Sequence, residues 1–422
     1  MAELDPPAAR REGTGESGSR RNPSEQSAPH GSTDPSPDRQ AGGQPTESRA
    51  QPQSNSEAGM RAQGAWSNAW SGSGPNGFGR RQSYAALDLG TNNCRLLIAR
   101  PSGENFTVID AFSRVVRLGE GLAQSGRLSD AAMERTLSAL AICADKLKRR
   151  NVYLARSVAT EACRRAENGA EFIERAREQT GIALDIISAR EEARLAVLGC
   201  HVLLEPGKGP AMIFDIGGGS TELILIESTD TVPRILDWQS VPWGVVSLTE
   251  SCGQEGDCDR DRQGRYTTMR QLVSDSFAGF ERRVAPAREH ASLAGPLRLL
   301  GTSGTVTTLA SLHLDLPHYD RQAVDGLIVP AASMRSISSR LSTMAIAERR
   351  KLPCIGRERA DLVVAGCAIL EAILDLWPAM KLGVADRGIR EGILRSLIAG
   401  RANGERPSDE TPRLRASDRA KP

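Results

Sequence analysis

The sequence lacks any uninterrupted apolar run of about 18 residues, the length that a membrane-spanning helix needs. Its N-terminal region also lacks the apolar core of a signal peptide and is too rich in acidic residues for a typical transit peptide. These absences argue against a membrane protein and lead us to expect a cytoplasmic one.

A strong excess of charge of either sign is missing too. Lys and Arg together number 54 and Asp and Glu together number 52, which gives a formal net charge of +2. This balance creates no global field that would attract DNA or a membrane surface, so neither is expected as a partner. A polyanionic ligand would have to be bound by local charges.

Cysteine patterns that bind metals are absent as well. The 8 cysteines are scattered, and none forms a Cys-x-x-Cys pair or a Cys/His spacing typical of metal ligands. Several lie in apolar runs, as buried reduced thiols do. Cys252 and Cys258 flank an acidic insertion; they could form a pair, bind a metal or belong to a variable surface loop.

Both ends of the chain are poor in residues that build a core. In residues 1–80 the only Leu, Ile or Val is Leu4, whereas Gly, Pro and Ser account for 33 of these 80 positions. Such segments cannot bury enough apolar surface to offset the entropy cost of ordering. We therefore expect disordered tails at 1–82 and 401–422, and no role is predicted for the N-terminal tail.

Between the tails, the apolar periodicity predicts the same series of elements twice. Strands are expected at 84–90, 94–100 and 106–118 and again at 211–217, 221–227 and 232–242, and each set is followed by alternating helices and strands. The opening segments also match, as LDLGTNNCRLLI and FDIGGGSTELIL. We expect an α/β protein with lobe I at 83–195 and lobe II at 196–400 around a ligand-binding cleft, the last helix being able to pack back on lobe I.

The second opening turn, DIGGGSTE, combines an anion-binding loop with carboxylates. Its glycines let backbone N–H groups approach an anion closely, and two hydroxyls add donors. Asp215 and Glu222 supply the oxygen ligands that Mg²⁺ uses beside phosphate. A plain hairpin is the alternative. The predicted phosphate-binding residues here are Gly217, Gly218, Gly219, Ser220 and Thr221.

Two further turns fit phosphate. In DLGTNN, backbone and side-chain donors are available and Asp88 could orient a metal-bound water; the residues concerned are Asp88, Gly90, Thr91, Asn92 and Asn93. In GTSGT, a strand is followed by a helix start, which describes either an anion site or a simple capped helix. Its predicted residues are Gly301, Ser303, Gly304 and Thr305.

Charged side chains near predicted strand ends complete the candidate site. Glu191 and Glu192 begin an apolar helix but point about 100° apart, so both cannot face one site equally, and two ordinary first-turn carboxylates are the alternative. Arg164 and Arg165 follow another strand, where a guanidinium is a natural bidentate partner of phosphate or part of a solvated helix face.

Taken together, the motifs resemble the Ppx/GppA family of exopolyphosphatases and guanosine pentaphosphate phosphohydrolases. The segments AALDLGTNNCRLLIAR, RLGEGL, SVATEACRRAEN, IISAREEARLAVLG, IFDIGGGSTELIL, PWGVVSLTE, LLGTSGTVTTLA, YDRQAVDG and DRGIREGIL run in family order across 84–400. The resemblance implies a duplicated actin-like fold of ribonuclease H type, shared with sugar kinases and heat-shock ATPases. It corresponds to the short, two-lobed form of the family.

The resemblance also implies roles for particular residues. Glu192 corresponds to the family's catalytic glutamate, Asp215 and Glu222 to its magnesium ligands, and Arg164 to a phosphate contact. Arg190 stands where some members have Asn. Mg²⁺ is the expected cofactor, with Mn²⁺ as an alternative, and because family members often form dimers a homodimer is an open expectation.

Three functions are compatible with these motifs. The first is hydrolysis of a terminal phosphoanhydride, either of inorganic polyphosphate, which the short form favours, or of guanosine pentaphosphate (pppGpp). The second is an ATP-dependent kinase or clamp of the same fold group, although no adenine pocket is evident. The third is a non-catalytic sensor of polyphosphate or an alarmone, against which the intact set of carboxylates argues.

Overall fold

The computed structural model describes residues 82–103, 105–229, 232–253 and 258–402. The two tails predicted to be disordered lie outside these ranges, except for Gln82, Arg401 and Ala402 at their inner ends. All eight cysteines fall within the described ranges and all are free, so Cys252 and Cys258 are not disulfide-bonded. Within the same ranges, no helix is both long enough and apolar enough to cross a membrane.

The first sheet has five strands in the order β3-β2-β1-β4-β5. The central strand β1 pairs antiparallel with β2 and parallel with β4. Its side chains alternate, so that Ala85, Leu87 and Leu89 face one apolar cluster and Tyr84 and Ala86 face another. The strands are β1 (Ser83–Leu89), β2 (Asn93–Ser102), β3 (Asn105–Val115), β4 (Val152–Ala159) and β5 (Asp185–Ile186).

The second sheet repeats this topology, with six strands in the order β10-β11-β9-β6-β7-β8. Strand β6 pairs antiparallel with β7 and parallel with β9, as β1 does with β2 and β4. The repeat confirms the predicted duplicated, two-lobed α/β fold. The strands are β6 (Pro210–Ile216), β7 (Thr221–Glu227), β8 (Arg234–Val241), β9 (Leu299–Thr302), β10 (Ile328–Pro330) and β11 (Lys381–Ala385).

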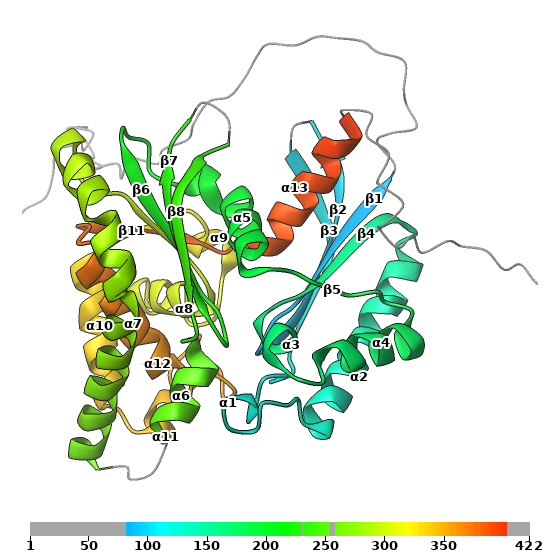
Figure 1. Ribbon diagram of the computed structural model, residues 1–422, viewed down its shortest axis with the longest axis horizontal. Helices are drawn as coiled ribbons and strands as arrows, with labels where there is room; N and C mark the ends of the chain where they lie inside the picture. The colour runs from blue at the N-terminus through cyan, green and yellow to red at the C-terminus, as the bar shows by residue number, and fades with distance from the viewer. Residues whose placement is uncertain (1–81, 104, 230–231, 254–257, 403–422) are drawn as a thin grey trace, which may run out of the picture. The chain divides into compact units, whose positions relative to one another are not determined.

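Helices cover both faces of each sheet. Figure 1 shows α2 and α4 on the outer face of the first sheet, α7, α10 and α12 on the outer face of the second, and α5 and α13 between the sheets. The helices are α1 (Leu122–Ser125), α2 (Asp130–Arg149), α3 (Glu161–Arg165), α4 (Gly169–Thr180), α5 (Ala189–Cys200), α6 (Val245–Cys252), α7 (Asp259–Ala294), α8 (Gly304–His313), α9 (Arg321–Val324), α10 (Ala331–Thr343), α11 (Ile346–Arg349), α12 (Val363–Leu376) and α13 (Ile389–Ala402).

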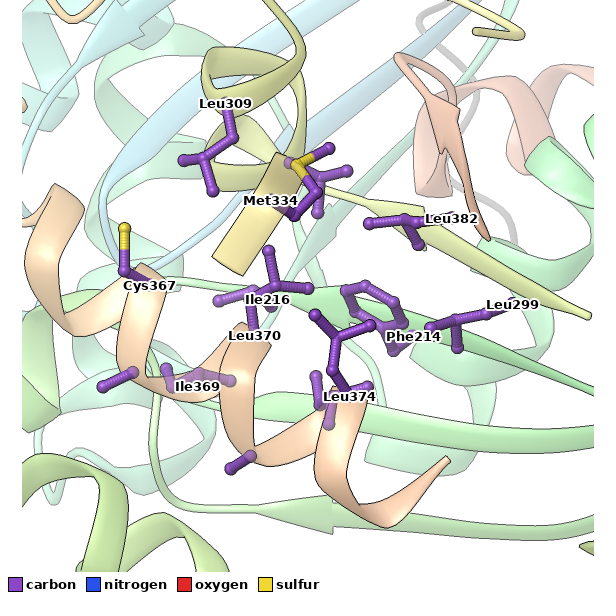
Figure 2. Packing of buried hydrophobic residues seen from close by; sticks show 14 of the residues in the cluster. Phe214, Ile216, Leu299, Leu309, Met334, Cys367, Ile369, Leu370, Leu374 and Leu382 are labelled. Carbon is purple, nitrogen blue, oxygen red and sulfur yellow. The ribbon is translucent and has the colours of Figure 1, made fainter. Parts of the chain in front are cut away.

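The core of lobe II forms where α12 and neighbouring helices pack on the second sheet. Phe214 and Ile216 of β6 meet Leu370 and Leu374 of α12, and all four are buried (Figure 2). The strand can present a large apolar side chain at every second position because the sheet pleat sends these to one face. This packing fixes the end of β6, where the glycine turn begins.

Helices α5 and α13 join the two lobes. Leu195 of α5 and Ile393 of α13 are buried against the first sheet, whereas Val197 of α5 is buried against the second. The last helix therefore does pack on lobe I. The expected lobe boundary at residue 196 falls inside α5, a helix that contacts both sheets.

Several predicted boundaries differ from the structure. The strand expected at 106–118 ends at Val115, and the next two N–H groups, of Val116 and Arg117, both donate to the Asn92 carbonyl, at 2.9 and 3.1 Å, as Arg117 turns into a left-handed conformation with φ of 47°. Helix α6 was not predicted at all. Helix α2 is capped by Ser129, whose side chain accepts from the Ala132 N–H.

Candidate active site

The predicted phosphate turns and carboxylates meet in one cleft. The cleft encloses about 960 Å³, including space that is open to solvent. Fifteen of the predicted residues line it: Asp88, Gly90, Thr91, Asn92, Asn93, Glu192, Asp215, Gly217, Gly218, Gly219, Ser220, Glu222, Ser303, Gly304 and Thr305. Arg164, Thr221 and Gly301 do not line it.

The two opening turns are equivalent hairpins that contact each other. The Gly90 N–H donates to the Asn93 carbonyl at 2.9 Å, and the Gly217 N–H donates to the Ser220 carbonyl at the same distance. A Cβ on Gly218 would lie 3.0 Å from Cβ of Thr91 and 3.1 Å from the backbone N of Asn92. A side chain at Gly218 would therefore crowd the first hairpin where the two meet, and both hairpins present their tips to one cleft.

The third turn contributes through Ser303, Gly304 and Thr305 but not through its first glycine. Ser303 caps α8, its hydroxyl accepting from the Val306 N–H at 3.2 Å. Gly301 belongs to β9, where a Cβ would lie 2.4 Å from the ring of Phe214. The glycine at this position thus permits core packing, and the structure does not bring it to the cleft.

Thr221 was also expected at the phosphate, but its side chain is occupied elsewhere. It is fully buried, and its hydroxyl donates to the Trp243 carbonyl at 2.6 Å. The hydroxyl of the neighbouring Ser220 instead donates to Oε1 of Glu222 at 2.7 Å, within the cleft. Thr221 therefore anchors the base of the hairpin.

The two adjacent glutamates of α5 have different surroundings. Glu192 lies in the cleft and is 7% exposed. Glu191 pairs outside the cleft with Arg156 at 3.0 Å and Arg194 at 2.6 Å. Helix spacing alone left the two equivalent, and only the family resemblance pointed to Glu192; in the structure Glu192 lines the cleft and Glu191 does not.

Arg164 contacts the cleft carboxylates from behind. Its Nη1 donates to Oε2 of Glu192 at 3.1 Å and to the Ile187 carbonyl at 2.8 Å, and its Nη2 donates to Oε2 of Glu161 at 2.5 Å. The guanidinium is thus fixed between two side chains and the backbone that precedes α5. Its direct contact with phosphate, implied by the resemblance, stays a prediction.

Burial and mutual repulsion raise the pKa values of four carboxyls in the cleft, those of Asp88, Glu192, Asp215 and Glu222. Burial is the main cause in each case, and the charge of Glu222 adds to it at Glu192 and at Asp215, whose pKa rises to about 8. The pKa of Glu222 is itself raised by burial, although hydrogen bonds from Ser220 and Ser240 oppose this. The pKa of Asp88 is raised by burial and held back by Arg95 and Arg390. Such a site favours binding of positive charge.

This donor set fits a magnesium ion that phosphate and water help to coordinate. Among the residues that the structure describes, no three His, Cys, Asp or Glu side chains converge closely enough to hold a metal alone. Mg²⁺ needs only one or two carboxylates beside phosphate oxygens and water. The buried Oδ1 of Asp88 accepts no hydrogen bond from any described residue, which leaves an oxygen for a bound water or ion.

The cleft also contains residues that the sequence patterns did not indicate. Arg95 and Arg359 line it and bring positive charge to the carboxylates. Arg95 sits opposite Asp88 in the β1–β2 ladder, so hairpin register could have indicated it. Arg359 lies in a turn before α12, and no local pattern announces its position.

Comparison with known proteins identifies similar chains. The model of the Ppx/GppA phosphatase family matches residues 97–400. Exopolyphosphatase 2 of Mycobacterium tuberculosis is 32% identical over 327 residues, which cover 74% of this chain and 98% of that protein. A putative exopolyphosphatase of Haemophilus influenzae is 29% identical, covering 76% of this chain and 94% of the relative.

Solved structures agree with the fold described above. The crystal structure of the Ppx/GppA family member of Aquifex aeolicus superposes with a TM-score of 0.60 at 27% identity, covering 76% of this chain and 98% of that one. An exopolyphosphatase structure from Cytophaga hutchinsonii gives a TM-score of 0.65 at 24% identity, covering 76% and 98%, and supports the fold alone.

Proposed function

Because the chain belongs to the Ppx/GppA phosphatase family, we propose that it releases orthophosphate from the end of inorganic polyphosphate. The reaction class, hydrolysis of a phosphoanhydride, is that of the family. The observation that best supports the proposal is the meeting of two equivalent glycine hairpins around Glu192, Asp215 and Glu222 in one cleft. The hairpins offer backbone donors to phosphate, which every segment of a polyphosphate chain presents.

In the proposed reaction, the chain holds the phosphates and positions a water. N–H groups of the hairpins and of the α8 N-terminus bind phosphate oxygens. Glu192, oriented by Arg164, accepts the proton of the attacking water as the water approaches the terminal phosphorus in line with the leaving oxygen. Burial and the charge of Glu222 raise its pKa, and a higher pKa makes the carboxylate a stronger base.

Asp215 and Glu222 would hold the divalent cation. When bound, Mg²⁺, or Mn²⁺ in its place, supplies positive charge that offsets the charge developing on the phosphate oxygens. Arg95 and Arg359 lie in the same cleft and would add positive charge along the phosphate chain.

The experiment that tests the substrate compares kcat/KM for long-chain polyphosphate, tripolyphosphate and pppGpp with one preparation of the protein. We expect the highest value for the long chain. The highest value for pppGpp would instead support the guanosine pentaphosphate phosphohydrolase activity. Absence of orthophosphate release from all three would contradict both activities.

Measurement of the molar mass in solution would test the homodimer that the family resemblance suggests.

A further inference from the structure

A segment of lobe I is bonded to the first hairpin at its tip. The N–H groups of Val116 and Arg117 donate to the Asn92 carbonyl at 2.9 and 3.1 Å, and the Gly119 N–H donates to the Thr91 carbonyl at 2.9 Å. Residues 117–122 carry the motif RLGEGL, to which the proposed reaction assigns no task. Any movement of this segment must therefore be shared with the hairpin.

The Arg117 side chain extends from this segment to lobe II. Its Nη2 donates to the Glu358 carbonyl at 3.0 Å and to Oδ2 of Asp361 at 3.2 Å, where the Asp361 side chain is only 15% exposed. Arg359, which lies between these two acceptors in the sequence, lines the cleft, and so does Leu362, the residue after Asp361. Arg117 thus binds the turn that carries Arg359.

A second contact joins the same segment to the other hairpin. The Gly121 N–H donates to Oε1 of Glu250 at 2.9 Å. Glu250 lies in α6, and the first N–H group of that helix, at Val245, donates to the Gly217 carbonyl at 3.0 Å. Separation of this segment from α6 would break the contact with Glu250, and its separation from the turn at 358–361 would break the contacts made by Arg117.

We propose that Arg117, with Asp361 as its partner, is a positioning residue that latches the first phosphate hairpin to the turn at 358–361 of lobe II and so holds Arg359 in the cleft. The proposal rests on the proposed function. Arg117 is not among the residues that line the cleft, so it acts through the Asn92 backbone on one side and the turn at 358–361 on the other. Loss of the latch should misplace the phosphate chain, because small displacements of reacting groups cost large factors in rate.

A double-mutant cycle tests the latch. Arg117→Ala should lower kcat/KM for polyphosphate about tenfold, and Asp361→Ala, which leaves the bond to the Glu358 carbonyl, by no more than that. The double variant should be no worse than Arg117→Ala, because Arg117→Ala already removes the contact with Asp361. Arg127→Ala, which removes an exposed ion pair with Glu167 within lobe I, is the matched control and should keep wild-type kcat/KM. Losses that multiply, or single variants with wild-type kcat/KM, would overturn the proposal.

Amide hydrogen exchange tests the latch in the absence of substrate, by measuring how fast the segments that it holds exchange. In Arg117→Ala, peptides covering 357–364 and the hairpin around Asn92 should exchange faster than in the wild type, while α4 should be unchanged. Unchanged exchange at 357–364 would overturn the latch. A wild-type protein that releases no orthophosphate would contradict the proposed function, and the exchange result would still decide the latch.

Discussion

Arg164 donates from Nη1 to Oε2 of Glu192 at 3.1 Å, and the same nitrogen donates to the Ile187 carbonyl. The guanidinium is therefore fixed to the backbone that leads into α5, the helix that carries Glu192. In the cleft it offsets the burial and the negative charge of Glu222, both of which oppose ionisation of Glu192. Arg164 therefore favours the ionised form of Glu192 against these two effects.

The first prediction concerns the proposed base. Glu192→Gln should lower kcat by about 10²–10⁴-fold with little change in KM, because a general base contributes to the transition state more than to substrate binding. Steady-state release of orthophosphate from polyphosphate measures both constants.

Its neighbour provides the control. Glu191→Gln changes the same side chain one position earlier, where the carboxylate pairs with Arg156 and Arg194 outside the cleft. This variant should keep near-wild-type kcat. Near-full turnover by Glu192→Gln, or an equal loss in both variants, would remove Glu192 from its role.

A second prediction separates Arg164 as a support for Glu192 from Arg164 as a phosphate contact. Replacement by Met should lower kcat about tenfold or more through misorientation of Glu192, with a smaller change in KM. If Arg164 mainly binds phosphate, KM for polyphosphate should rise more than kcat falls. Arg165→Met on the same short helix is the control, since Arg165 lies 3.8 Å from Glu161 and makes no hydrogen bond to Glu192 in the structure.

The order of the elements and the duplicated hairpins could be predicted because they depend on local patterns. Alternating apolar residues and a turn of glycines define a buried hairpin wherever it occurs. The choice between Glu191 and Glu192 could not be made from spacing alone. It depends on which side of α5 faces lobe II, and tertiary packing sets that.

Other parts of the site could not be predicted either, because their positions also depend on tertiary packing. Arg359 follows no strand or helix start, and only the packing of the turn before α12 brings it to the cleft. Gly301 is the opposite case, because the sequence predicted it at the phosphate site and it does not line the cleft. Its motif resembles a phosphate turn, but the glycine is needed where β9 passes the ring of Phe214.

A third prediction concerns the metal. Chelation of divalent cations should abolish orthophosphate release, and Mg²⁺ or Mn²⁺ should restore it. Asp215→Asn and Glu222→Gln should each raise the Mg²⁺ concentration needed for half-maximal activity, because each removes a hard anionic oxygen ligand. Full activity in the chelator, or variants with the wild-type Mg²⁺ requirement, would contradict the assignment.

The fourth prediction tests stability against pH, away from the cleft. Asp110 of β3 accepts from Lys146 Nζ at 2.7 Å and from Arg150 Nε at 2.8 Å, and these bonds lower the pKa of Asp110 to about 2. Because the folded pKa lies below the unfolded value of 3.8, the pair stabilises the fold above pH 3.8, and this contribution is lost as the pH falls towards 2.

Asp110→Asn should therefore reduce the free energy of unfolding by about 1 kcal/mol at pH 7, a partly exposed pair being worth little more. The difference from the wild type should shrink as the pH is lowered from 3.8 towards 2, as measured by urea unfolding. Asp145→Asn, which disrupts an exposed pair with Arg149 on α2, should have a smaller effect at pH 7. A difference for Asp110→Asn that is independent of pH would contradict the assigned pKa.

The most direct test is a crystal structure of Glu192→Gln with Mg²⁺ and a short polyphosphate. The side chain of residue 192 should lie within reach of one water molecule from the terminal phosphorus, with both glycine hairpins and the start of α8 bonded to the phosphate chain. A chain bound outside this cleft, or a terminal phosphorus remote from residue 192, would contradict the account.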